Sequence, residues 1–319
     1  MTTDHASTAP SGHQEATASA ASAASVSDAP PVPDAPPVPD AASVLAELRC
    51  AGRTVARYGV RPDLDPRLSP RPFLHPVTTL GGVPVTEEMP GDHLHHLGAG
   101  IAVPDVDGRN FWGGRTFVRD RGPVALDNHG TQRHTGWARR EDGGFEEELV
   151  WEADGDVLLR ERRTVTATAL TGHAWALGLT FTLTPAGGAV TIGSPATNGR
   201  PGAGYGGFFW RAPKEASAPA VFTHDAEGED AVHGRTADWI ALAGDGWTLV
   251  LAGADGTTRR DPWFVRTTEY PGVGSSLAWS RRLTVPADRP LVRRLVTVVA
   301  DSRLDRRTAA DLVKEATAA

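Results

Sequence analysis

The chain has 319 residues, a net charge of −7 and a pI near 5.9. It contains no dense basic run, so the charge pattern gives no footprint for nucleic acid, and no uninterrupted apolar stretch of about 18 residues predicts a membrane span. The single cysteine, Cys50, rules out an intramolecular disulfide framework, and we expect a buried or inert thiol there. We therefore expect a cytoplasmic protein that binds neither nucleic acid nor membrane.

The N-terminal part of the chain differs in composition from the rest. Residues 1–42 are mostly Ala, Ser, Thr, Pro and Asp, and the hexad Asp-Ala-Pro-Pro-Val-Pro occurs at 28–33 and again at 34–39. Such a segment cannot bury enough apolar surface to offset its ordering entropy, and its prolines favour extended conformations. We predict a disordered tail over 1–42, followed by a single β-sandwich domain over 43–319.

Alternation of apolar and polar residues predicts strands in the rest of the chain. Residues 43–50 form too short an apolar run to distinguish helix from strand. The clearest strand covers 175–183, where large apolar residues alternate with small or polar ones. Residues 277–285 repeat this pattern, with Arg281 in one inward position. Further runs rich in β-branched or aromatic residues lie at 164–170, 239–243, 247–251 and 291–299.

Turns separate these strands, and helical spacing is confined to the C-terminus. Gly-Gly, Asp-Gly and Pro-containing turns lie at 185–188, 244–246 and 255–256. Many short strands joined by turns indicate an all-β fold, and we predict a large antiparallel β-sandwich. Residues 305–318 predict a short C-terminal helix that covers an edge strand. We expect the arginine pairs at 281–282 and 293–294 to lie on a solvated sheet face.

The most distinctive motif is Gly-Asp-His-Leu-His-His-Leu-Gly at 91–98, which contains Asp92, His93, His95 and His96. Histidine titrates near neutral pH and is the commonest metal ligand. In an extended segment His93 and His95 would share one face, whereas a tight loop could bring all three imidazoles together. Imidazoles beside a carboxylate suit a zinc or iron site, and they suit general acid–base catalysis equally. Hydrogen bonding within turns is a purely structural alternative.

Three other segments carry candidate binding residues. Trp112 and Arg115 belong to the motif Phe-Trp-Gly-Gly-Arg at 111–115, and His134 follows it in the chain. Tryptophan beside arginine and glycine suits a sugar-binding pocket. The tryptophan could equally be a residue of the hydrophobic core. The glycine-rich run at 202–211 lacks the strand and helix context of a phosphate loop, and we expect it to place Tyr205 and Arg211 in a cleft. Arg211 could bind a carboxylate or a diol, or form a surface salt bridge.

A fourth polar and aromatic segment lies at 261–266 and 269–272, and Asp261 is its candidate. Loops on a rigid sandwich are where binding residues collect, which is why we include it.

Five segments carry a resemblance to a known family: Arg-Pro-Phe-Leu-His-Pro-Val at 71–77, Gly-Val-Pro-Val-Thr at 82–86, the histidine motif, Asp-Val-Asp-Gly-Arg-Asn-Phe-Trp at 105–112, and Tyr-Gly-Gly-Phe-Phe-Trp-Arg at 205–211. Together they resemble the bacterial PmoA-like family, labelled methane oxygenase PmoA, over about residues 50–305. Where its members read Asp-His-Pro-His-His-Arg-Gly, this chain has Leu94 and Leu97. The resemblance implies a soluble β-sandwich similar to the galactose-mutarotase-like supersandwich, in a family associated with sugar-catabolic genes.

The leading hypothesis is a carbohydrate-active enzyme that transfers protons on a sugar or oxidised sugar, as an epimerase, lyase or hydrolase. His95 or His96 would be the acid or base, and Asp92 would orient an imidazole, with His93 beside them. Contacts to a small-molecule carbohydrate substrate are expected from His75, Trp112, Arg115, His134, Tyr205, Arg211 and Asp261.

Two other functions fit the same residues. One is a metal-dependent oxygenase, as the family label implies, in which His93, His95 and either Asp92 or His75 bind a divalent metal, iron or zinc. The other is a non-catalytic sugar-binding module. The sequence predicts neither a firm cofactor nor an oligomeric state.

Overall fold

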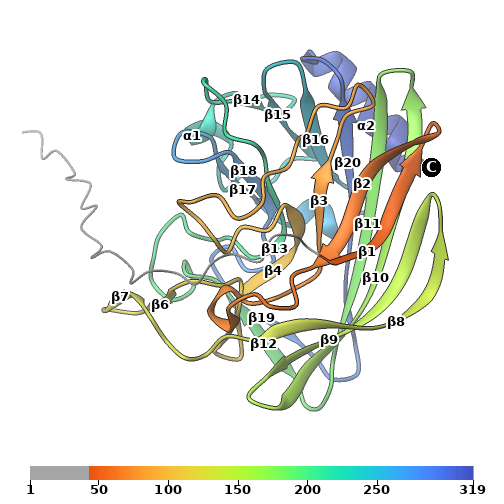
Figure 1. The fold of residues 1–319 in the computed structure, drawn as a ribbon. Coiled ribbons are helices and arrows are strands. Elements are labelled where there is room, and N and C mark those ends of the chain that lie inside the picture. The colour runs from red at the N-terminus through yellow and green to blue at the C-terminus, as the bar shows by residue number, and fades with distance from the viewer. Residues whose placement is uncertain (1–42, 319) are drawn as a thin grey trace, which may run out of the picture. The chain divides into compact units, whose positions relative to one another are not determined.

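The computed structural model describes residues 43–318, so the tail predicted at 1–42 lies outside the described residues. Two large antiparallel sheets pack face to face and enclose one apolar core (Figure 1). The predicted all-β sandwich with a short C-terminal helix is therefore confirmed. Neither helix of the described part is long and apolar enough to cross a membrane.

The first sheet has ten strands, seven of which follow the order β1-β2-β3-β4-β13-β18-β17. Strands β5 and β12 pair with β4, and β19 pairs with β12. The strands are β1 (Ser43–Cys50), β2 (Arg53–Val60), β3 (Phe73–Val77), β4 (Ala99–Val106), β5 (Arg109–Phe111), β12 (Val190–Gly193), β13 (Gly207–Arg211), β17 (Trp263–Arg266), β18 (Gly272–Ser275) and β19 (Leu283–Val285).

The second sheet has eight strands in the order β14-β15-β16-β20-β11-β10-β9-β8. These are β8 (Thr131–Glu141), β9 (Gly144–Ala153), β10 (Asp156–Thr171), β11 (Ala174–Pro185), β14 (Ala220–Phe222), β15 (Trp239–Ala243), β16 (Thr248–Gly253) and β20 (Leu291–Ala300). The remaining elements are the hairpin β6 (Thr116–Val118) and β7 (Gly122–Val124), the helices α1 (Glu229–Val232) and α2 (Arg306–Ala318), and the 3-10 turns η1 (Pro66–Leu68) and η2 (Thr258–Arg260).

Alternating residues of β11 form the centre of the core, as its sequence predicts. Its inward side chains belong to the main apolar cluster between the sheets, because successive side chains of a strand point to opposite faces. They are Trp175, Leu177, Leu179, Phe181 and Leu183. Residues 43–50, which sequence left open, form strand β1, and Cys50 is a buried free thiol, as predicted.

The strand predicted over 277–285 is wrong for most of its length, since only Leu283–Val285 forms a strand. The ring of Trp279 packs directly against Gly204 and Gly234. A Cβ added at either glycine would lie only 2.5 Å from this ring. This contact holds residues 277–282 in a loop. Arg281 is exposed rather than inward, whereas Arg282 donates to Asp105 at 2.7 and 2.9 Å.

Helix α2 covers the outer face of the eight-stranded sheet rather than an edge strand. It lies against β20, β16 and β15, which are not at the sheet edge (Figure 1). Its buried residues Ala309, Leu312, Val313 and Ala316 join an apolar cluster with outward side chains of those strands. The helix therefore buries apolar surface that would otherwise face water.

The outer face of the ten-stranded sheet is the face that carries the candidate site. On β13, Phe208 and Trp210 join the core, while Phe209 joins a separate aromatic cluster on the opposite face. Strand β18 beside it has no side chain at Gly272, and a Cβ there would lie 2.8 Å from the Tyr270 ring and 3.0 Å from Phe209. The two rings thus fill the space that a larger residue on β18 would need.

Candidate functional site

The histidine motif forms two tight turns between β3 and β4, and this folding brings its imidazoles together. The N–H of His93 donates to the carbonyl of Pro90 at 2.8 Å, and that of His96 to the carbonyl of His93 at 2.9 Å. The rings of His93 and His96 stack with centroids 4.5 Å apart, and His95 meets His96 edge-on at 4.8 Å. Of the two conformations that the sequence allowed, the tight loop is the one observed.

The three imidazoles differ in their exposure to solvent. The side chain of His93 is 31% exposed beside Asp92, His95 is half-buried, and His96 is 2% exposed. Burial, reinforced by the neighbouring His93, lowers the pKa of His95 to about 3. Burial also lowers the pKa of His96 well below its ordinary value. Both rings are therefore neutral at pH 7.

An aromatic surface surrounds His96. Its ring centroid lies 5.1 Å from those of Phe209 and Tyr270 and 5.9 Å from that of Trp112. Beyond Trp112 the surface continues to Tyr205 at 4.6 Å. We call Trp112, Tyr205, Phe209, Phe264 and Tyr270 the aromatic wall. Of the predicted binding residues, Trp112 thus contacts His96 directly, and Tyr205 lies one ring further away, against Trp112.

Arg211 crosses beneath the histidine loop and is held by two carboxylates. Its Nε and Nη2 donate to Glu87 at 3.1 and 2.9 Å, and its Nη2 lies 3.6 Å from Asp92. Its guanidinium also lies 5.0 Å from the centre of the Tyr270 ring, a cation–π distance. Of the roles considered above for Arg211, the structure contains a salt bridge, in which the arginine is fully buried and the Glu87 side chain is 31% exposed.

Four buried nitrogens of this site have no hydrogen-bond partner in the described part of the chain: Nδ1 of His93, His96 and His129, and Nη1 of Arg211. Of these, His93 Nδ1 lies 3.2 Å from a carboxylate oxygen of Asp92. An unsatisfied buried donor or acceptor costs free energy, so native proteins rarely leave one without a partner.

Arg71, which the sequence analysis did not single out, holds the loops of the site together. It is 5% exposed, and its guanidinium donates to the carbonyl oxygens of Ser69 at 3.0 Å, Trp112 at 3.1 Å and His95 at 2.7 Å. Burial lowers the pKa of Arg71 to about 9, so the side chain is still a cation at pH 7. Its place in the Arg-Pro-Phe-Leu-His segment was the available sequence signal.

Two glycines and a further histidine support His95 from the other side. Gly113 and Gly114 have φ of 101° and 72°, where glycine is favoured, and the His95 ring lies 3.1 Å from the Cβ position of Gly114. The imidazole of His129 lies 2.7 Å from the carbonyl of Gly114 and is close enough to lower the pKa of His95. His129 was not among the site residues predicted from the sequence.

Other predicted site residues lie elsewhere. His134 on β8 points between the sheets and pairs with buried Glu147 at 2.7 Å. Asp261 forms a buried salt bridge with Arg293 at 2.5 Å, so Arg293 is not on a solvated sheet face. Arg115 is exposed and has no hydrogen bond or ion pair within residues 43–318. From the segment of Asp261, the structure instead brings Tyr270 to the histidines.

His75 lies near the site but outside the imidazole contacts. Its Nδ1 is 3.0 Å from the Thr86 hydroxyl and its Nε2 is 3.9 Å from Glu88. The alternative ligand set of His93, His95 and His75 is therefore not brought to one point. Across residues 43–318, no three His, Cys, Asp or Glu side chains are grouped so that they could hold a metal ion.

The sequence matches the family of unknown function DUF6807 over residues 46–314, and the chain belongs to that family. The resemblance to a PmoA-like methane oxygenase is therefore wrong: it depended on short motifs, whereas the match over most of the chain is to a family with no assigned activity. No curated protein matches the sequence.

One solved structure, the heparinase III BT4657 gene product, is similar at 15% identity with a TM-score of 0.22. The similarity covers 53% of this chain and 21% of that one, so it spans about a fifth of the heparinase chain. A likeness at this level supports no inference about function.

Proposed function

We propose that this DUF6807 protein is a carbohydrate-active enzyme that transfers protons on a sugar bound between the histidine loop and the aromatic wall. The observation that carries the proposal is that two of the four buried, unpartnered nitrogens, His96 Nδ1 and Arg211 Nη1, belong to side chains that contact the aromatic wall at Trp112 and Tyr270. Sugars present apolar C–H faces together with hydroxyl groups. Binding sites of this kind combine aromatic surface with a few fixed polar groups.

The charges around Arg211 favour a neutral sugar over an oxidised one. Glu87 and Asp92 already face this single guanidinium. A carboxylate on the substrate would meet this pair of negative charges, and like charges at short range disfavour binding. A hydroxyl oxygen can accept from Nη1 without adding charge. We therefore place a neutral hydroxyl at Arg211.

The basicity of the histidines favours proton transfer between oxygen atoms. A group such as His95, with a pKa of about 3, is too weak a base to take a proton from carbon, as a lyase would require. Proton transfer to and from hydroxyl oxygens requires a much weaker base than proton abstraction from carbon. Tyr270, whose pKa burial raises, stays protonated and can donate. Among the predicted activities, interconversion of aldose anomers fits best, with His96 as acceptor and Tyr270 as donor.

The test is anomer exchange in solution. Two-dimensional exchange NMR on a panel of neutral aldoses would measure the rate of α–β interconversion with and without protein. We expect acceleration of at least one aldose, reduced about 100-fold or more in His96→Gln. His173→Gln is the matched control, since the His173 side chain is 87% exposed. Full activity of His96→Gln, or no acceleration of any aldose, would contradict the proposal.

A non-catalytic sugar-binding module is the second candidate, because the aromatic wall could bind a sugar without any proton transfer. It predicts binding that survives His96→Gln and is lost in Trp112→Ala, with no exchange catalysis. Titration calorimetry on the same aldose panel separates the two functions. The catalytic function requires exchange, and the binding module does not.

A further inference from the structure

A cleft of about 780 Å³ lies away from the histidine site, between the turn that joins β19 to β20 and the η2 turn. Strand β19 belongs to the ten-stranded sheet and β20 to the eight-stranded sheet, so the cleft lies where the chain passes from one sheet to the other. None of the histidine-site residues lines it. Its occupant is thus independent of the function proposed above.

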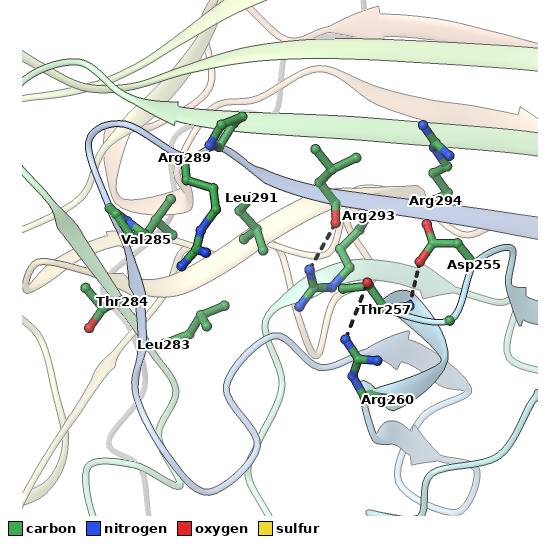
Figure 2. A pocket seen from close by; sticks show the side chains of 14 residues that line it. Asp255, Thr257, Arg260, Leu283, Thr284, Val285, Arg289, Leu291, Arg293 and Arg294 are labelled. Carbon is green, nitrogen blue, oxygen red and sulfur yellow. Dashed lines mark hydrogen bonds between the residues drawn. The ribbon is translucent and has the colours of Figure 1, made fainter.

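Three arginines face this cleft, and two of them lack a carboxylate partner of their own. Figure 2 shows Arg260 and Arg289 on opposite sides of Arg293, whereas Arg294 points away from them. Arg293 is neutralised by Asp261 at 2.5 and 3.1 Å. Arg260 donates a 3.4 Å hydrogen bond to the Thr257 hydroxyl, and its charge also acts on Asp261, with which it forms no ion pair. Arg289 has no hydrogen bond or ion pair within the described chain.

The one carboxylate in the lining does not offset these charges. Asp255 uses its Oδ1 to accept from the N–H groups of Thr257 and Thr258, each at 2.8 Å, which stabilises the η2 turn. The arginine whose charge helps to lower the pKa of Asp255 is Arg294, which points out of the cleft. The cleft therefore keeps a local positive charge on a chain whose net charge is −7.

The rest of the lining is apolar or carries hydroxyl groups. Leu291 lies between Arg289 and Arg293, Leu283 and Val285 lie on the Arg289 side of the cleft, and Thr284 adds a hydroxyl (Figure 2). The planar guanidinium group matches the paired oxygens of phosphate, sulfate and carboxylate groups. We propose that this cleft binds a small molecule that carries such an oxyanion on a body with an apolar face, with Arg260 and Arg289 holding the anion.

Phenyl phosphate is a suitable probe because it combines both features, and inorganic phosphate is the probe without the apolar face. Titration calorimetry at constant ionic strength would compare the wild-type protein with the double variant R260Q/R289Q. Both arginines are exposed, so the variant should fold, and its melting temperature would confirm this. We expect the variant to bind phenyl phosphate about tenfold or more weakly, and wild type to prefer it over inorganic phosphate.

The control is R121Q/R303Q, which removes the same charge from two exposed arginines outside the cleft. Equal weakening in both double variants would show that the anion responds only to overall charge and would overturn the proposal. Absence of phenyl phosphate binding, or unchanged binding in R260Q/R289Q, would overturn it too. Phenyl sulfate and benzoate in the same titration identify which oxyanion the arginines prefer.

Discussion

Arg71 donates a hydrogen bond of 2.7 Å to the carbonyl oxygen of His95, and the same guanidinium reaches the carbonyl of Trp112 at 3.1 Å. A buried cation with carbonyl partners alone is unusual, because burial of a charge is costly unless it is well hydrogen-bonded. Here it joins the histidine loop to the loop that carries Trp112 of the aromatic wall. Arg71 is thus a positioning residue for both halves of the candidate site.

Arg71→Lys should loosen the site without removing the charge. A lysine ammonium cannot span the carbonyls that the guanidinium fork reaches, so at least one buried carbonyl loses its donor. We expect the free energy of unfolding to fall by about 2–3 kcal/mol, measured by urea denaturation. The histidine ring signals in NMR spectra should move as well. Unchanged stability together with unchanged His95 signals would contradict the positioning role.

Gly113→Ala should damage the site more than the same change at a glycine with a similar backbone. A Cβ at Gly113 would lie 2.6 Å from the Leu68 carbonyl oxygen and 2.7 Å from the His95 Cβ, whereas Gly108, also at positive φ, has nothing within 4 Å. Both variants should lose about 1 kcal/mol of unfolding free energy because alanine disfavours the left-handed conformation. Only Gly113→Ala must also displace His95.

Urea denaturation of the two glycine variants gives the comparison directly. We expect Gly113→Ala to lose about 2 kcal/mol more of unfolding free energy than Gly108→Ala, an overpacking cost. Equal losses would mean that the contact with His95 relaxes freely.

Local pattern predicted the fold well where one face of a strand is buried. Strand β11 follows this rule from Gly178 onward, whereas its first four residues are buried on both faces because Ala174 and Ala176 pack in the cluster beneath α2. The helix at Arg306–Ala318 follows its apolar spacing. The rule failed at 277–282, since the alternation there arises from Trp279, which packs on two distant glycines. Contacts between segments far apart in sequence leave no period to detect.

The same distinction separates the site residues that could be predicted from those that could not. The histidines are neighbours in sequence, so their density alone indicated a site. His134 and Asp261 looked equally polar, but their partners Glu147 and Arg293 come from other strands and draw them away. Arg71 was missed for the converse reason, because its acceptors are backbone carbonyls that carry no sequence signal.

The ionic network between the sheets should be far more sensitive to mutation than a surface ion pair. Arg163 is 1% exposed and donates to Glu161 at 2.7 and 2.9 Å and to the Tyr58 hydroxyl at 2.8 Å. Arg163→Met would leave Glu161 buried without its cation, and we expect a loss of about 3–5 kcal/mol in unfolding free energy.

Arg133→Gln is the matched control for that substitution. It removes a two-bond arginine–glutamate pair with Glu152 whose side chains are 55% and 32% exposed. We expect less than about 1 kcal/mol from this change. Similar losses in the two variants would mean that burial does not determine how much the Arg163 network contributes to the unfolding free energy.

The neutral histidines should make stability depend on pH in a defined direction. The folded pKa of His95 and of His96 lies below the ordinary value of 6.5, so between those values the unfolded chain binds more protons than the folded one. Stability from these groups is therefore complete above about pH 6.5 and is lost as the pH falls toward the folded pKa, which for His95 is about 3. Each neutral histidine should add a slope of about 1.4 kcal/mol per pH unit in that window.

Urea denaturation between pH 5 and 7 should show a flatter dependence in His95→Gln and in His96→Gln than in wild type, and no flattening in His173→Gln. Parallel pH profiles for all four proteins would mean that the imidazoles are not held neutral by burial.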